Sequence, residues 1–251
     1  MGLLMGIRMS GGNVGKVEVS LVFPAYNEAE KLEETVKKTI GTLREFTRSY
    51  EIIIAEDGST DGTDKIASEL SKKYLAVRHI HNDKRLGRGL ALKNAFSNSR
   101  GEVLAFMDVD LATNLKHLKT LVESIKEGYD IVIGSRMLPE SNVKRALSRR
   151  IASKFYNFLV RILLGSKIRD HQCGFKAFKR EPFLQILRET EATHWFWDTE
   201  ILVRAFRKGC RIKEIPVEWK SGKETKVRLF KDSFTMGYQV LKFWWKLKSQ
   251  P

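Results

Sequence analysis

The stretch EIIIAEDGSTDGTDKIASELSKKY, residues 51–74, decides the fold of this chain. Its first seven residues form an apolar run of the kind found in buried strands. Gly58 then permits a tight turn, and Asp61 or Thr63 can cap the helix that the remainder, 63–74, is expected to form. A strand that runs through a capped turn into a helix is half of a β-α-β unit.

The same alternation continues through the first half of the chain. We expect strands at 17–23, 51–57, 75–81, 102–110 and 129–135. Between them, we expect helices at about 29–47, 63–74, 90–99 and 115–128. Strands that alternate with helices of this size predict an α/β fold, in which helices cover both faces of a mainly parallel sheet.

Four polar clusters fall where these strands end. They are PAYNE (24–28), EDGSTDGT (56–63), DVD (108–110) and GSR (134–136). Ligands of such sheets bind at the carboxyl ends of the strands, so one shared site is expected there. The chain has no GxGxxG and no GxxxxGK[ST] pattern, which disfavours a dinucleotide site and a P-loop.

The pair Asp108 and Asp110, in AFMDVDLATN (105–114), is the strongest candidate for chemistry at this edge. An aspartate at the end of a strand can simply bond nearby backbone amides, and an Asp-x-Asp pattern is common by chance. The coincidence with the other polar clusters favours a functional role. Glu56 and Asp57 raise the same question, because a capped turn explains neither of them. A carboxylate there could accept hydrogen bonds from a base or a ribose.

The net charge of +15 is confined to the second half of the chain. Residues 1–130 carry 19 Lys and Arg against 19 Asp and Glu, whereas residues 131–251 carry 26 against 11. A uniformly basic protein would suggest nucleic acid. Here only one half is expected to face an anionic partner.

A basic segment of that half favours a membrane surface as the partner. Segment 143–169 has eight basic residues and no acidic one, with Ile151, Phe155, Phe158 and Ile162 at helical spacing. Such a segment is either a core helix with a basic outer face or a helix that lies on a membrane. We favour the second interpretation.

The C-terminal segment, 230–251, predicts a second basic amphipathic helix. It carries Phe243, Trp244 and Trp245 among lysines, a combination that suits the headgroup layer of a bilayer. No run in the sequence approaches the roughly 18 apolar residues of a membrane span. We therefore expect peripheral contact with an anionic membrane surface, without a transmembrane span and without nucleic acid.

The expected location is the cytoplasmic face of a membrane. The two cysteines, Cys173 and Cys210, fit no metal spacing and no disulfide framework, which favours a reducing compartment. The first residues, MGLLMGIRMSGG, are too short and too rich in glycine for a signal peptide.

Seven motifs, taken in order, resemble the family-2 glycosyltransferases, and in particular the enzymes that make dolichyl-phosphate sugars. They are PAYNE, EDGSTDGT, HNDKRLGRGLALKNA, DVDLATN, GSR, DHQCGFKAF and WFWDTEIL. The resemblance runs from about residue 17 to residue 240. It implies a GT-A fold, a nucleotide-sugar donor and a dolichyl or polyprenyl phosphate acceptor. DHQCGFKAF and FWDTEIL resemble the glucosyltransferase branch more than the mannosyltransferase branch, which implies UDP-glucose as the donor and leaves GDP-mannose as the alternative.

The resemblance also implies a set of donor-binding residues. By position, Pro24, Tyr26 and Glu28 match residues that line the nucleotide. Asp57 matches the residue that reads the base.

A divalent cation is implied by the same resemblance. Asp108 and Asp110 match the family's Asp-x-Asp, which holds Mg²⁺ or Mn²⁺ against the donor diphosphate. Ala112 stands where some mannosyltransferases have a third ligand, so the metal would rely more on phosphate and water. Lys220 and Lys226 match basic residues on a loop over the donor.

On the acceptor side, Arg136 of GSR matches an arginine near which the sugar and the acceptor phosphate meet, and with Asp110 it is expected to be catalytic. A phosphate monoester has already lost a proton at pH 7, so it needs positive charge to position it and no base to activate it. Arg149 and Arg150 are further candidates for this positioning. Asp170 could orient an arginine or act as a base, and we favour the first role.

One further acid, Asp198 in FWDTEIL, has a structural explanation. We expect it to be the N-cap of a helix, with Glu200 in the first turn. Accordingly, we expect Asp198→Asn to cost far less activity than Arg136→Ala.

The predicted organisation is an N-terminal tail (1–16), a GT-A domain (17–229) and a basic aromatic helix (230–251). The domain divides into a nucleotide-sugar-binding half, 17–135, and an acceptor-binding half, 136–229. Two rival functions stay open. One is transfer to a sugar hydroxyl, which would need a base. The other is a non-catalytic membrane- or RNA-binding protein, in which the acidic motifs would be idle.

Overall fold

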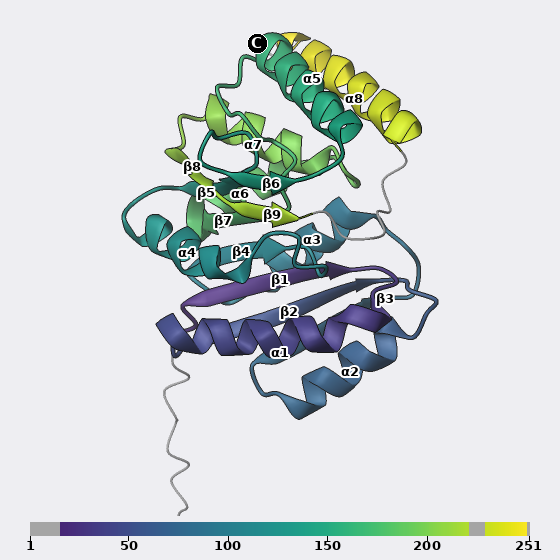
Figure 1. The fold of residues 1–251 in the computed structure, drawn as a ribbon, viewed down its shortest axis with the longest axis vertical. Coiled ribbons are helices and arrows are strands. Elements are labelled where there is room, and N and C mark those ends of the chain that lie inside the picture. The colour runs from purple at the N-terminus through teal and green to yellow at the C-terminus, as the bar shows by residue number, and fades with distance from the viewer. Residues whose placement is uncertain (1–15, 221–228, 250–251) are drawn as a thin grey trace, which may run out of the picture.

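The computed structural model describes residues 16–220 and 229–249. A seven-stranded sheet runs through the centre of the molecule, in the order β3-β2-β1-β4-β7-β5-β8 (Figure 1). Its strands are β1 Val19–Ala25, β2 Tyr50–Asp57, β3 Val77–Asn82, β4 Val103–Met107, β5 Ile131–Ser135, β7 Phe175–Lys179 and β8 Ile212–Pro216. Two short strands, β6 Asn142–Lys144 and β9 Glu218–Lys220, pair in a separate ribbon.

The helices of the first half lie close to where the sequence predicted them. The helices of the chain are α1 Ala29–Phe46, α2 Thr63–Lys73, α3 Arg88–Ser97, the 3₁₀ turn η1 Leu115–His117, α4 Leu118–Lys126, α5 Leu147–Leu164, α6 Arg180–Glu189, α7 Trp197–Arg207 and α8 Leu229–Ser249. The expected strand 102–110 is too long, because β4 ends at Met107 and both aspartates lie in a turn beyond it. Leu111 in this turn has φ 49°, a left-handed conformation that is uncommon outside glycine.

The sheet is mainly parallel, as expected. β1 pairs in parallel with β2 and β4, β2 with β3, and β5 with β8. β7 runs antiparallel between β4 and β5, and the sequence did not predict it. This strand brings DHQCGFKAF to the middle of the sheet. As a result, the carbonyl of Gly174 accepts the N–H of Asp108 at 3.2 Å.

Helices cover both faces of the sheet. Every residue of β4 and β5 is buried, which requires packing on both sides. α1 packs against α2 and α4, while α3 packs against α6 and α6 against α7 (Figure 1). An aromatic cluster fills the core between the sheet and α3, α6 and α7. Its members are Phe96, Phe106, Phe178, Phe183 and Trp197.

α5 and α8 lie side by side and form an outer layer above the sheet (Figure 1). A separate cluster of buried apolar side chains holds them to the α7 region: Tyr156, Val160, Leu164, Phe196, Val203, Met236, Val240 and Phe243. α8 occupies the segment in which a C-terminal helix was predicted. It buries Phe243 and exposes Trp245. Within the two described ranges, no helix combines the length and the apolar character that crossing a bilayer requires.

Candidate active site

A cleft of about 1460 Å³ lies at the carboxyl ends of the strands. Residues from all four predicted polar clusters line it, as the expectation of one shared site requires. The predicted site residues in its lining are Pro24, Tyr26, Glu28, Asp57, Asp108, Asp110, Arg136 and Arg149. Side chains of α5 and α8 close the opposite wall.

At one end of the cleft, the turn after β1 is tied to the turn after β2. The N–H of Asn27 donates to Ser59 Oγ at 3.0 Å, and Asn27 Oδ1 accepts the N–H of Thr60 at 2.9 Å. Asn27 has φ 52°, a conformation that asparagine adopts more readily than most residues. The guanidinium of Arg85 lies 3.9 Å from the centroid of the Tyr26 ring. This end therefore offers a flat aromatic and cationic surface.

Asp57 lines the same end, and its carboxylate also holds main chain. Oδ1 accepts the N–H of Leu86 at 2.7 Å, and Oδ2 accepts that of Gly87 at 2.9 Å. Gly87 has φ 104°, and a Cβ there would collide with His194, so this position requires glycine. Each carboxylate oxygen has a second lone pair. Asp57 therefore fixes the loop before α3 and keeps acceptor capacity toward the cleft.

Asp108 and Asp110 lie in the turn beyond β4, in different surroundings. Asp110 Oδ1 accepts the N–H of Ala112 at 3.0 Å, and Asp108 Oδ1 accepts from Arg88 Nη2 at 2.8 Å. Burial and the negative charge of Asp108 raise the pKa of Asp110. Gly174 is so close that a Cβ there would overlap the Asp108 carboxylate. The pair is tightly placed and has an excess of negative charge, which fits a divalent cation with oxygen ligands.

Arg88 connects Asp108 to the interior through Asp198. Its Nη1 donates to Asp198 Oδ2 at 2.6 Å, and the fully buried Lys176 donates to Asp198 Oδ1 at 2.6 Å. The prediction that Asp198 is an N-cap is therefore wrong, because α7 begins at Trp197 and the carboxylate is instead paired with two cations. Pairing of this kind avoids the large cost of an uncompensated buried charge.

Arg136 lies in the cleft wall and is held by Asp170. Its Nε and Nη2 donate to the two carboxylate oxygens at 2.7 and 2.8 Å, and its backbone N–H donates to Oδ2 at 2.9 Å. Burial alone would raise the pKa of Asp170, but the Arg136 guanidinium holds that pKa well below its ordinary value. A carboxylate paired so strongly orients the arginine and is a poor base.

Two further arginines, Arg145 and Arg149, line the cleft near Arg136. The guanidinium groups of Arg136 and Arg145 each lie 5.5 Å from the centroid of the Trp219 ring. Burial and the like charge of Arg136 lower the pKa of Arg145 to about 10, and Arg145 Nε is buried with no hydrogen-bond partner among the described residues. A bound anion would accept a hydrogen bond from this Nε and would stabilise the charged form of Arg145. Arg150 is exposed and lies outside the described lining of the cleft.

Of the two lysines expected over the donor, Lys220 ends β9 and Lys226 lies outside the described residues. The backbone N–H of Lys220 donates to the carbonyl of Ala112 at 2.8 Å. β9 is therefore fixed against the turn that carries the two aspartates. The Lys220 side chain is exposed.

The wall of the cleft formed by α5 and α8 is apolar. Phe155, Leu159, Tyr238 and Leu241 line it. α5 and α8 also carry apolar side chains that are exposed to solvent. We call these side chains the exposed stripe: Leu147, Ile151, Phe155, Phe158 and Ile162 of α5, and Tyr238, Leu241 and Trp245 of α8. The four α5 residues that the helical spacing singled out are thus surface residues, and the core-helix interpretation is wrong for them.

Sequence reasoning missed Arg88, Arg145 and Lys176 as members of this site. Arg88 and Lys176 stand in motifs that carried the family resemblance, HNDKRLGRGLALKNA and DHQCGFKAF. Their positions in those motifs were the available signal. Arg145 lies in the acid-free segment 143–169, from which Arg149 and Arg150 were predicted instead.

A family model described as "Glycosyl transferase family 2" matches residues 20–187, more than half of the chain. The chain belongs to this family. The resemblance stated from the motifs is thereby confirmed. The helix-covered, mainly parallel sheet with its cleft at the carboxyl ends is the GT-A fold of such glycosyltransferases.

The family includes curated relatives of close similarity. "Glycosyltransferase AglD" of Haloferax volcanii is 48% identical over 247 residues, which cover 97% of this chain and 40% of that protein. The chain thus spans less than half of the length of this relative. "Dolichyl-phosphate beta-glucosyltransferase ALG5A" of Trichomonas vaginalis is 34% identical, with 85% of this chain and 69% of that protein covered. The dolichyl-phosphate beta-glucosyltransferase of Saccharomyces cerevisiae is 31% identical, with coverages of 90% and 74%.

Solved structures of similar fold include two sugar-phosphoglycerate synthases. Glucosyl-3-phosphoglycerate synthase from Mycobacterium tuberculosis, in complex with UDP, has a TM-score of 0.69 at 20% identity, with 92% of this chain and 79% of that chain covered. Mannosyl-3-phosphoglycerate synthase from Rubrobacter xylanophilus also has a TM-score of 0.69, at 18% identity, with 93% and 75% covered. At these identities the likeness establishes the fold.

Proposed function

We propose that this glycosyltransferase moves a hexose, with inversion, from UDP-glucose to a dolichyl or polyprenyl phosphate at a membrane surface. Relatives named dolichyl-phosphate beta-glucosyltransferase support this choice of sugar and acceptor. The observation that carries the proposal is the composition of one cleft, which is acidic near the donor turns, cationic around Arg136 and apolar along α5 and α8. A phosphorylated lipid is the acceptor class that uses the last two features together.

Asp108 and Asp110 would hold Mg²⁺ or Mn²⁺ at the donor end of the cleft. Carboxylate oxygens suit these hard cations, and the raised pKa of Asp110 indicates negative charge that a cation would balance. When bound, the cation supplies positive charge beside the diphosphate leaving group. A solved structure of the mycobacterial glucosyl-3-phosphoglycerate synthase holds Mn²⁺ together with UDP, which supports this assignment.

The acceptor needs to be positioned and does not need to be deprotonated. A phosphate monoester carries a charge of about −1.5 to −2 at pH 7, so its oxygen is already a nucleophile. Arg136, oriented by Asp170, and Arg145, with its buried unpaired Nε among the described residues, are the groups that would bind it. Attack on the anomeric carbon from the side opposite the diphosphate gives inversion.

The exposed stripe would face the membrane. Phe155, Tyr238 and Leu241 belong both to the stripe and to the cleft lining, so an isoprenoid chain can pass from the bilayer to the cleft along an apolar surface. The basic residues of the same helices add electrostatic attraction of about 1 kcal/mol each near an anionic surface. The cytoplasmic face of the membrane stays a prediction from the sequence.

The proposal is tested by measuring transfer of labelled hexose from UDP-glucose and from GDP-mannose to a short polyprenyl phosphate and to the unphosphorylated alcohol. We expect transfer from UDP-glucose to the phosphate alone, and its loss in EDTA. Comparable transfer to the alcohol would contradict the acceptor, preference for GDP-mannose would contradict the donor, and full activity in EDTA would contradict the metal.

Asp110→Asn tests the donor end separately. The substitution keeps the size of the side chain but removes one of two carboxylates, so we expect the fold to persist and activity to fall at least about 100-fold. Glu34→Gln, an exposed position on α1, makes the same charge change away from the cleft and should leave activity unchanged. Equal turnover in Asp110→Asn and wild type would remove this residue from the mechanism.

A further inference from the structure

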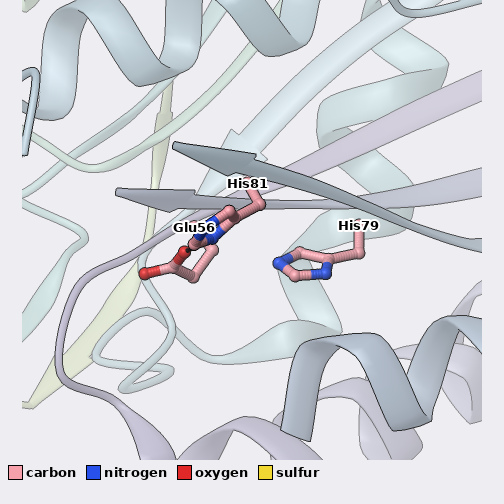
Figure 2. A group of neighbouring side chains, drawn as sticks. All are labelled: Glu56, His79 and His81. Atoms are coloured by element: carbon pink, nitrogen blue, oxygen red, sulfur yellow. Dashed lines mark hydrogen bonds and ion pairs between the residues drawn. The ribbon is translucent and has the colours of Figure 1, made fainter. Parts of the chain in front are cut away.

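A second candidate metal site lies outside the cleft, at the ends of β2 and β3. Glu56, His79 and His81 gather there (Figure 2). Glu56 and His81 are paired residues of adjacent parallel strands, and His79 stands two residues before His81 on the same face of β3. Asp57, the next residue after Glu56, points to the opposite face and lines the cleft. The cluster and the candidate active site therefore lie on opposite sides of one strand end.

The three side chains point toward a common centre. Their possible ligand atoms all lie within 4.8 Å of one another. His81 Nδ1 is 2.5 Å from Glu56 Oε2. Figure 2 shows the ring of His79 with one nitrogen directed toward the other two residues. His79 Nε2 is buried and has no hydrogen-bond partner in the described part of the chain. A buried ring nitrogen of this kind carries a cost that a metal bond would remove.

The surroundings prepare these groups to act as ligands. Glu56 Oε1 accepts the N–H of Ser59, at 2.5 Å, which fixes the carboxylate. Asp83 Oδ1 lies 3.3 Å from His81 Nε2 and can accept a hydrogen bond from a proton on that nitrogen, which leaves Nδ1 for a metal. Carboxylate partners of this type orient metal-bound histidines in many proteins.

We propose that Glu56, His79 and His81 bind a transition-metal ion of the Zn²⁺ class. Two imidazoles and one carboxylate are a ligand set that Zn²⁺ prefers, with water completing a tetrahedron. The metal would take the place of the proton between His81 Nδ1 and Glu56 Oε2. This site differs in kind from the all-oxygen pair Asp108 and Asp110, which suits Mg²⁺ or Mn²⁺.

The remaining histidines of the chain do not form a rival site. The sequence has five histidines. His117 Nε2 accepts the N–H of Glu218 at 2.9 Å. Both ring nitrogens of His171 are bonded, to Asn157 Oδ1 and Ser166 Oγ. His194 lies against Gly87 in another part of the molecule. His79 and His81 are therefore the pair of histidines that can supply two imidazole ligands to one metal ion.

The bound ion would fix a loop that borders the cleft. Residues 83–87 follow β3 directly, and their last two amides are held by Asp57. Arg85 of this loop stacks on Tyr26 at 3.9 Å. An ion that joins the ends of β2 and β3 would restrict both ends of this connection. The transfer chemistry does not pass through it.

The test is a titration of metal-free protein with Zn²⁺ in competition with a chromophoric chelator. We expect one tightly bound Zn²⁺ per chain. In His79→Gln with His81→Gln, the dissociation constant should rise at least about 100-fold, because disturbing even the partners of metal ligands costs 10–100-fold. Asp108→Asn with Asp110→Asn is the matched control and should bind Zn²⁺ as the wild type does. Loss of binding in this control instead would assign the Zn²⁺ to the cleft and overturn the proposal.

X-ray absorption at the zinc edge of the unmodified protein makes the test independent of variant folding. Two imidazole ligands and one carboxylate are expected in the spectrum. Absence of stoichiometric binding, equal affinity in the double histidine variant, or a spectrum without imidazole would each overturn the site. Because transfer activity is not the readout, these outcomes do not bear on the proposed function.

Discussion

The sheet and the outer layer of α5 and α8 differ in how far they bury their apolar residues. In the sheet, every position of β4 and β5 is buried. In α5, Tyr156, Val160 and Leu164 pack inward, whereas Ile151 and Phe158 on another face are 59% and 58% exposed. The sheet buries its apolar side chains without a further partner. The outer layer leaves apolar area exposed, which is available for contact with another surface. An apolar residue at helical spacing therefore does not identify the core by itself.

The two regions also differ in how their charges are balanced. At the donor end, Asp110 has excess negative charge, and the carboxylate of Asp198 is neutralised by buried cations. Around Arg136, three arginines line the cleft, and one buried carboxylate, Asp170, is paired with Arg136. One region thus favours a cation and the other an anion. This difference supports the proposed reaction between a metal-bound diphosphate and an acceptor phosphate.

The largest effect should come from the most closely packed point of the donor end. Gly174→Ala would push a methyl group into the Asp108 carboxylate, so we expect transfer activity to fall at least about 100-fold. Gly41→Ala, in α1 with open space around the new Cβ, is the control and should keep full activity. Wild-type activity in Gly174→Ala would show that the placement of Asp108 is not critical.

The next effect separates the two faces of α5. Leu164 is 3% exposed, and Leu164→Ala should lower the free energy of unfolding by roughly 2–5 kcal/mol. Ile162, which is 63% exposed, should tolerate the same change within about 0.5 kcal/mol. Denaturant unfolding measures both values. Similar losses in the two variants would mean that both faces are packed in solution.

A smaller effect is expected at the exposed stripe. Ile151→Ser with Phe158→Ser should weaken sedimentation with anionic vesicles about tenfold, because each side chain contributes apolar area on entering the interface. The binding of the wild type should also weaken at high salt. Leu75→Ser is the control, since Leu75 is fully exposed before β3, away from α5 and α8. Unchanged binding in the double variant would show that the stripe does not contact lipid.

The smallest effect concerns the stability of the donor end. The pKa of Asp110 is raised above 3.8, so the folded state keeps this proton to a higher pH than the unfolded state does, and the ionised form opposes folding at pH 7. Without metal, Asp110→Asn should be slightly more stable than the wild type at pH 7. The difference should shrink as the pH falls toward 3.8. Lower stability of the variant at pH 7 in denaturant unfolding would contradict this sign.

The elements of the first half were predictable because each is encoded locally. The unit 51–74 contains its strand, its turn and its helix in one stretch, and the structure follows it closely. β7 could not be predicted in the same way. Its place between β4 and β5 depends on antiparallel pairing with strands about 45 to 75 residues earlier in the chain, and no local pattern specifies such a partner.

Site residues could be predicted where they directly follow a strand in the sequence. They could not be predicted where residues far apart in the sequence come together only in the folded protein. Asp108 and Asp110 follow an apolar run, so their exposure at the sheet edge could be inferred. Asp198 was misread because its partner Arg88 lies 110 residues away, and the helix start next to it offered a simpler explanation. Motif membership identified the neighbourhood of Arg88 but gave no information on its contacts.

Arg88 is a counterion of Asp108 that belongs to the cleft itself. Its guanidinium donates to Asp108 Oδ1, so a divalent cation bound at this carboxylate would compete with Arg88 for the same negative charge. A nucleotide-sugar donor would reduce this competition, because its diphosphate carries negative charge for both Arg88 and the cation. Under the proposed function, cation and donor would therefore strengthen the binding of each other, by the same factor in each direction. A weak affinity for Mg²⁺ or Mn²⁺ without nucleotide is the expected behaviour of such a cleft, in which metal and donor load as a single unit.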